Sequence, residues 1–173
     1  MTARVGHRAP EFKAPAVVNG EFKDVSLADY RGKWVCLFFY PLDFTFVCPT
    51  EITEFSKRSG EFKELNAVVL GASVDSVHSH KAWIQNGLGD ISYPLLSDMT
   101  HEISRQYGVL IEDQGFSLRG TFLVDPEGKL RWSQVNDTGV GRSVSEVVRV
   151  LAALQTGENC PVEWKPGQKT LGK

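Results

Sequence analysis

A cysteine between a predicted strand and a predicted helix is the residue of this chain best suited to covalent chemistry. The apolar run from Trp34 to Tyr40 predicts a buried strand, and the segment from Glu51 predicts the opening of a helix. Cys48 lies between them and is followed by Pro49, which suits a first helical turn because it lacks an N–H group. Unpaired N–H groups and the helix dipole favour negative charge at that position. The sequence therefore predicts a reactive thiolate at Cys48 rather than an inert buried thiol.

The overall composition excludes several other classes of function. The chain has 173 residues, a net charge of −2 at pH 7 and 42% hydrophobic residues, which is typical of one globular domain. We therefore expect no nucleic-acid partner and no binding to an anionic membrane. No apolar run approaches the ~20 residues of a membrane helix. The first ten residues also lack the apolar core of a signal peptide, so we expect a cytoplasmic protein.

The three cysteines and four histidines form neither a disulfide framework nor a metal motif. Cys36, Cys48 and Cys160 are far apart and contain no Cys-x-x-Cys pair. Cys36 lies inside the apolar strand and is predicted to fill the core. Cys160 stands in a polar C-terminal segment, where a structural cysteine is not expected. The pair formed by His78 and His80 is predicted to lie on a polar surface, so we expect no metal, and we expect catalytic or redox chemistry at cysteine.

Strands and helices alternate along most of the chain, which favours an α/β structure with a mixed central sheet flanked by helices. We expect a domain over residues 1–155 and an extended C-terminal tail over residues 156–173. The predicted strands cover residues 33–40, 67–74, 120–124 and 129–135, and residues 93–98 are predicted to form a short strand and turn. The predicted helices cover residues 48–65 with a break near Ser59 and Gly60, residues 76–85, 101–107 and 143–154.

Four separate motifs carry a resemblance to one enzyme family. The pattern Pro41-x-x-x-Thr45-x-x-Cys48, extended by Pro49-Thr50-Glu51, resembles the active-site loop of the peroxiredoxins. Residues 159–164 (Asn-Cys-Pro-Val-Glu-Trp) resemble the resolving-cysteine segment of the typical two-cysteine class. Residues 119–125 and 141–143 resemble two further blocks of that family. The likeness extends from about residue 5 to residue 167, and it implies a thioredoxin-like fold with peroxiredoxin extensions.

The resemblance implies distinct roles for Cys48 and Cys160. Cys48 would be the peroxidatic nucleophile, whose thiolate attacks one peroxide oxygen and becomes a sulfenic acid. Cys160 would attack that sulfenic acid and form a disulfide with it. In the class that this chain resembles, the two cysteines belong to different subunits, so the first turn of the Cys48 helix would have to unwind during the reaction.

The resemblance also implies roles for five other side chains. Thr45 would hold both peroxide and thiolate, although a turn threonine is the simpler interpretation. Pro41 would shape the loop and shield the sulfur from water. Arg119 would contact thiolate and peroxide, where a surface arginine is the alternative. Glu51 and Arg142 would orient Arg119, and Glu51 could equally be an ordinary carboxylate at a helix start.

A complete catalytic cycle follows from this resemblance. Hydrogen peroxide and organic hydroperoxides would be reduced in antioxidant defence without a metal or organic cofactor. Electrons would come from thioredoxin or from a flavin-dependent disulfide reductase. A homodimer would assemble further into a decamer, a ring of five dimers.

Two departures and two rival functions complete the sequence-based hypothesis. Residues 86–89 (Asn-Gly-Leu-Gly) match only part of a Gly-Gly-Leu-Gly insertion found in members that are easily overoxidised, and the chain carries no C-terminal Tyr-Phe pair. We therefore expect an enzyme that resists inactivation by excess peroxide. A general thiol–disulfide oxidoreductase is disfavoured because that class usually carries Cys-x-x-Cys. A redox-regulated holdase chaperone or peroxide sensor is compatible with the same cysteines.

Overall fold

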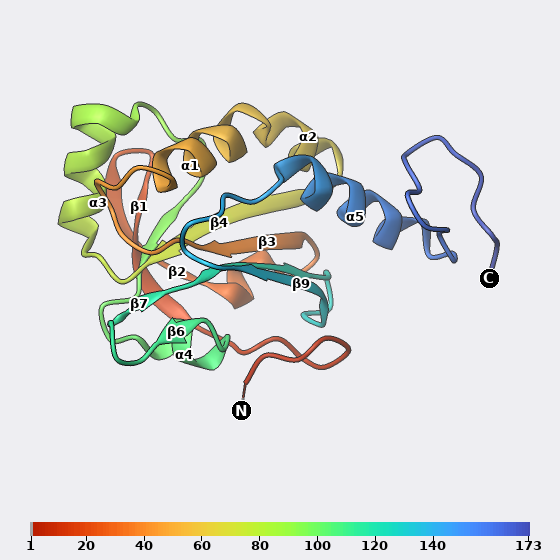
Figure 1. The fold of residues 1–173 in the computed structure, drawn as a ribbon, viewed down its shortest axis with the longest axis horizontal. Coiled ribbons are helices and arrows are strands. Elements are labelled where there is room, and N and C mark those ends of the chain that lie inside the picture. The colour runs from red at the N-terminus through yellow and green to blue at the C-terminus, as the bar shows by residue number, and fades with distance from the viewer. Residues whose placement is uncertain (1) are drawn as a thin grey trace. The chain divides into compact units, whose positions relative to one another are not determined.

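The computed structural model describes residues 2–173, and the chain forms two compact units over residues 1–142 and 143–173. The first contains the central sheet and most of the helices, and the second contains the last helix and the C-terminal segment (Figure 1). The division into a domain over residues 1–155 and a tail over residues 156–173 stays a prediction.

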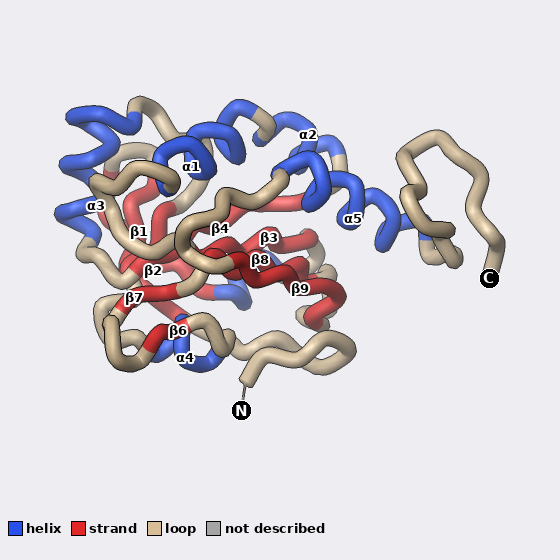
Figure 2. Tube along the Cα trace, viewed as in Figure 1, coloured by secondary structure: helices blue, strands red, loops and turns tan. Residues whose placement is uncertain are grey.

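A seven-stranded mixed sheet is the centre of the first unit (Figure 2). The three middle strands are parallel, and antiparallel strands complete the sheet on both sides, in the order β2-β1-β5-β4-β3-β8-β9. This mixed sheet with flanking helices confirms the predicted fold class. The strands are β1 (Lys13–Val18), β2 (Glu21–Ser26), β3 (Trp34–Phe39), β4 (Ala67–Ser73), β5 (Leu95–Ser97), β8 (Arg119–Val124) and β9 (Leu130–Asn136). A separate two-stranded ribbon pairs β6 (Leu110–Ile111) with β7 (Phe116–Ser117).

The central strands are buried on both faces, as their continuous apolar sequences predict. All six residues of β3 and all six of β8 are buried. Phe38 and Phe39 point to opposite faces, since neighbouring residues of a strand alternate. Phe38 stacks on Phe55 of one helix at 4.3 Å between ring centroids, while Phe39 contacts Tyr107 at 5.6 Å on the other face. Gly71 of β4 allows this close packing, because a Cβ there would lie 2.9 Å from the Phe38 ring.

Short helices surround this sheet. They are η1 (Leu27–Tyr30), α1 (Cys48–Lys57), α2 (Ser59–Glu64), α3 (Val77–Trp83), the π-turn η2 (Ile84–Leu88) and α4 (Glu102–Gln106). The helix predicted over residues 48–65 is divided at Arg58, next to the predicted break. The side chain of Ser76 caps α3 by accepting from the amide of Ser79 at 3.1 Å. Within residues 2–173, no helix combines the length and the apolar character needed to cross a bilayer.

The second unit consists of α5 (Val144–Thr156) and an irregular segment after it. Ser143 caps the start of α5, and Gly157 ends it in the left-handed conformation at φ 66° that glycine adopts most readily. The prediction of an extended tail is wrong. Two backbone hydrogen bonds of 2.8 Å, between Asn159 and residues 171 and 172, fold the segment back on itself.

Candidate active site

The candidate site begins where β3 passes through a short loop into α1. Cys48 is the first residue of α1 and is fully buried, and Val47 occupies the cap position without any capping side-chain hydrogen bond. Pro49 lies in the first turn, as expected from the sequence. Pro49 has no N–H group, and the amides of Thr50 and Glu51 contact the Val47 carbonyl at 3.1 and 3.4 Å, so the helix start favours negative charge next to Cys48 chiefly through its dipole.

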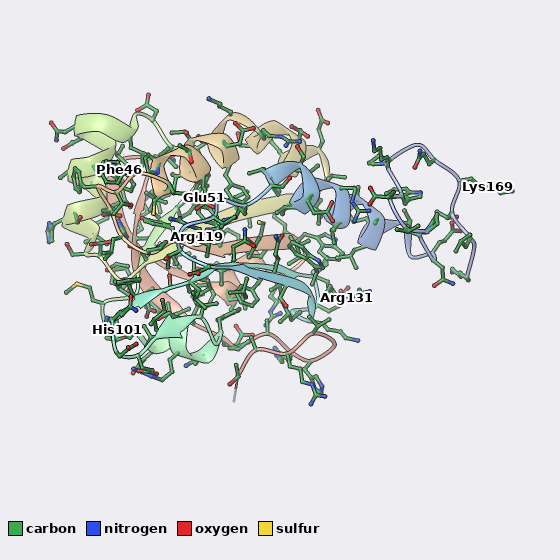
Figure 3. The ribbon with its side chains drawn as sticks, viewed as in Figure 1. Phe46, Glu51, His101, Arg119, Arg131 and Lys169 are labelled. Carbon is green, nitrogen blue, oxygen red and sulfur yellow. The ribbon has the colours of Figure 1, made fainter. Side chains whose placement is uncertain are left out.

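Arg119 brings a positive charge to the sulfur from a different part of the chain. It is the first residue of β8, which pairs with β3 and so lies beside the strand that leads to Cys48. Its Nη1 lies 3.3 Å from Cys48 Sγ and 2.8 Å from Glu51 Oε2, and its Nε donates to the carbonyl of Thr138 at 2.8 Å. Figure 3 shows the labelled side chains of Glu51 and Arg119 next to each other between α1 and the sheet. Arg119 is only 3% exposed, so the interpretation as a surface arginine is wrong.

Glu51 connects Arg119 to a second buried arginine. Its carboxylate accepts from Arg119 and from the backbone amide, Nε and Nη2 of Arg142, at distances between 2.8 and 3.0 Å. Arg142 also donates to the carbonyls of Phe39 and Gly120. Burial raises the pKa of Glu51, but the hydrogen bonds and charge of Arg142, with the charge of Arg119, outweigh burial and lower that pKa overall. The carboxylate is therefore ionised at neutral pH.

The charges of this cluster do not balance while Cys48 is a thiol. Two buried guanidinium groups face one buried carboxylate, and a buried charge without a partner is costly. A thiolate at Cys48 would neutralise the excess positive charge. The excess positive charge therefore stabilises negative charge that develops at this place in the site.

Thr45 and Pro41 lie in the loop before Cys48, but the described contacts do not join either side chain to the sulfur. The Thr45 hydroxyl donates to the carbonyl of Leu42 at 2.9 Å, which is the turn interaction considered from the sequence. A hydroxyl that donates in this way keeps lone pairs that can accept from a bound peroxide. Pro41 is buried directly after β3.

A buried polar cluster around Asp43 anchors the same loop, and the sequence alone did not predict it. The Asp43 carboxylate binds the Tyr40 hydroxyl, the Ser79 hydroxyl and His80 Nδ1, each at 2.8 Å. His80 is fully buried, and its Nε2 contacts the Leu96 carbonyl at 3.0 Å. The prediction that His80 lies on a polar surface is therefore wrong. The only available signal was an acidic residue inside an apolar loop, and nothing in it pointed to a histidine 37 positions later.

The other two cysteines have different surroundings. Cys36 is fully buried in β3, and burial raises its pKa to about 12, which confirms the prediction of a core residue. Cys160 is partly exposed in the second unit. In the part of the chain that the structure describes, no three His, Cys, Asp or Glu residues are grouped as a metal site would require.

Comparisons with known proteins identify the family of this chain. The model of the AhpC/TSA family matches residues 5–133. The chain is 58% identical to the chloroplastic 2-Cys peroxiredoxin BAS1 of Spinacia oleracea, over 96% of this chain and 67% of that protein. It is 56% identical to peroxiredoxin prdx-2 of Caenorhabditis elegans, over 98% of this chain and 89% of that protein. The reduced 2-Cys peroxiredoxin of Plasmodium vivax superposes with a TM-score of 0.93 at 44% identity, over 95% of this chain and 91% of that one.

The chain therefore belongs to the AhpC/TSA family and, within it, to the 2-Cys peroxiredoxins, which are peroxidase enzymes with a thioredoxin-like fold.

Proposed function

We propose that Cys48 is the peroxidatic cysteine and that Arg119 is its principal catalytic partner. The observation that carries this proposal is the 3.3 Å contact between Arg119 Nη1 and Cys48 Sγ, inside a cluster with excess positive charge. The thiolate attacks one oxygen of the peroxide, the O–O bond breaks, and the other oxygen leaves with the bond electrons and takes up a proton. Cys48 becomes a sulfenic acid, and hydrogen peroxide or an organic hydroperoxide becomes water or an alcohol.

The neighbouring residues assist this step in distinct ways. Arg119 stabilises the negative charge that develops on the leaving oxygen. The Thr45 hydroxyl accepts a hydrogen bond from the peroxide, and Pro41 helps to exclude water from the sulfur. Glu51 and Arg142 hold the Arg119 guanidinium in place, since Glu51 binds both arginines.

Cys160 completes the cycle in a second step. Its sulfur attacks the sulfenic sulfur of Cys48 in another subunit, water leaves, and an intersubunit disulfide forms. Cys48 is buried whereas Cys160 is partly exposed, so Cys48 must leave its pocket. The first turn of α1 has no side-chain cap, which favours its local unwinding.

Exposed structural features support a homodimer that assembles further. β9 is an edge strand of the seven-stranded sheet, and its Val135 is 48% exposed. The neighbouring Gln134 Oε1 is buried without a hydrogen-bond partner among the described residues. A second copy that pairs along β9 would cover this edge. Phe44 and Phe46 are 60% and 95% exposed beside the active-site loop, which favours a further apolar contact, and we propose a decamer.

The reductant must be a dithiol, because each cycle leaves one disulfide to be reduced. We propose thioredoxin or a flavin-dependent disulfide reductase as that partner, a cytoplasmic location and a role in antioxidant defence. Resistance to inactivation by excess peroxide also stays a prediction. Titration of turnover against peroxide tests it, and loss of activity at a slight excess would contradict it.

Consumption of peroxide with thioredoxin, thioredoxin reductase and NADPH tests the two-cysteine cycle. The wild type is compared with Cys48→Ser and Cys160→Ser. We expect turnover to be lost in both variants, while Cys160→Ser still consumes one equivalent of peroxide. Unchanged consumption by Cys48→Ser would refute the proposal.

A holdase chaperone or peroxide sensor is the alternative function. A wild type that reacts once with peroxide and is not recycled by either type of reductant would favour that alternative.

A further inference from the structure

The segment that carries Cys160 is a closed loop. The amide of Asn159 donates to the carbonyl of Gly172, and the amide of Leu171 donates to the carbonyl of Asn159, both at 2.8 Å. These bonds join residues on either side of a stretch of about twelve residues. Cys160 follows directly after the point of closure, so its backbone is held rather than free.

A second attachment fastens the loop to α5 through one arginine. Arg149 Nη1 donates to the backbone carbonyl of Trp164 at 2.9 Å. Its Nε and Nη2 bind the two carboxylate oxygens of Glu146, one turn earlier on the helix, at 2.6 and 2.7 Å. The carboxylate thus fixes the plane of the guanidinium. The Trp164 side chain is only 4% exposed, and its indole Nε1 donates to the carbonyl of Gln168 at 3.0 Å.

Between these attachments the Cys160 sulfur lies against the last turn of α5. It is 3.6 Å from the Thr156 hydroxyl oxygen and 3.8 Å from the Ala153 carbonyl oxygen. The residue stays partly exposed. The loop therefore presents the thiol at a defined place on the helix instead of covering it.

We propose that Arg149 is a positioning residue for the resolving step, because it fastens the loop after Cys160 to α5 and so keeps the thiol at one place. This inference rests on the proposed role of Cys160. A thiol on a loose segment samples a larger volume, which lowers its effective concentration at the sulfenic acid. Hydrogen bonding to Glu146 raises the pKa of Arg149, so the attachment stays charged throughout the working pH range.

Arg149→Met tests the inference in the full-length enzyme. Arg105→Met is the matched control, because Arg105 also binds a carboxylate with two nitrogens, at Glu112, but lies in the first unit and is 51% exposed. Reduced enzyme receives one equivalent of hydrogen peroxide. A sulfenic-acid trap and non-reducing electrophoresis then follow the sulfenic acid and the disulfide separately.

We expect Arg149→Met to form the sulfenic acid at the wild-type rate and the disulfide about tenfold more slowly, the loss associated with one charge-assisted hydrogen bond. Arg149→Lys keeps one charged donor, so its disulfide rate should lie between those of wild type and Arg149→Met. Tryptophan emission of Arg149→Met should shift to longer wavelength as Trp164 becomes exposed.

Three other results would contradict either the role of Arg149 or the proposed function. Disulfide formation as fast as in Arg105→Met would show that Arg149 does not position the thiol. An equal loss of both steps would show general structural damage instead of positioning. Absence of both sulfenic acid and disulfide in the peroxide-treated wild type would refute the proposed function itself, independently of Arg149.

Discussion

Replacement of Arg119 by methionine is the sharpest test of the active-site charge argument. In the wild type, two buried guanidinium groups face one Glu51 carboxylate, so the cluster can accommodate one further negative charge next to Cys48. Without Arg119, the remaining guanidinium is matched by Glu51 alone, and a thiolate would add an uncompensated buried charge. The variant also lacks the donor for the leaving oxygen. Loss of one such donor lowers rates by about 10²–10³-fold, and we expect that loss in the oxidation rate of Cys48.

The same contacts predict that Arg119→Met still folds. Glu51 loses the hydrogen bond from Arg119 but keeps the three from Arg142, while the Thr138 carbonyl and the Cys48 sulfur lose the donor that Arg119 supplied. We therefore expect a loss of about 1–2 kcal/mol in the free energy of unfolding. Urea denaturation of the reduced protein measures this quantity. A folded variant with a large kinetic defect would separate catalysis from stability.

The assay is the second-order rate constant of Cys48 oxidation in a single turnover, followed from pH 5 to pH 9. Arg119→Lys retains the positive charge, but an ammonium group lacks the planar set of donors with which Arg119 contacts Thr138, Glu51 and Cys48. The oxidation rate of Cys48 in this variant should therefore remain well below that of wild type. Arg105→Met serves as the exposed control and should react normally. If Arg119→Met oxidises Cys48 within threefold of the wild-type rate, the charge argument is refuted.

Three further experiments test the roles assigned to Thr45, Glu51 and Cys36. Thr45→Val should lower kcat/KM for peroxide about 10- to 100-fold, whereas Thr45→Ser keeps the hydroxyl and should retain the wild-type value. If steady-state assays show the same decrease of kcat/KM in both variants, the hydroxyl has no role. Glu51→Gln should lower the free energy of unfolding at pH 7 by about 3 kcal/mol, measured in urea, because two buried cations lose their counter-ion. The pKa of Glu51 in the folded protein lies below its ordinary value of 4.5. The stabilisation by the ionised carboxylate is therefore complete above pH 4.5 and is lost as the pH falls further. The free energies of unfolding of wild type and Glu51→Gln should thus converge in acid and nowhere else. Cys36, with a pKa of about 12, should react with iodoacetamide at pH 8 only in denaturant; mass spectrometry of the labelled native protein checks this.

The sequence predicted the elements whose signals are local. The apolar runs of β3 and β4 indicated buried central strands, because strands covered on both faces lack polar alternation. Pro49 after an apolar run and a short loop indicated the helix start at Cys48. Composition and cysteine spacing excluded a disulfide scaffold. The motif around Cys48 indicated the family, and the comparisons confirmed it.

Contacts between distant segments were not accessible in this way. The apolar run of β3 indicated that Phe38 and Phe39 are buried, but not which aromatic side chain would meet each of them. His80 looked like a surface residue beside His78, because a neighbouring pair of histidines in a polar helix carries no sign of burial. Only the tertiary structure places Asp43 against it. Similarly, the polar composition of the C-terminal segment suggested an extended tail. The hydrogen bond from Arg149 to the Trp164 carbonyl joins residues 15 positions apart and produces no local sequence pattern that could have predicted it.

The sequence by itself thus determined the layered α/β class and the family and indicated a cysteine as the candidate nucleophile, since these depend on residue types and spacing along the chain. The tertiary structure alone decided that Arg119, Glu51 and Arg142 form one buried cluster next to Cys48. These residues come from α1, from the start of β8 and from the loop after β9, and antiparallel pairing of β8 with β3 brings them together. Charge balance depends on distances in space, and sequence separation contains no information about those distances.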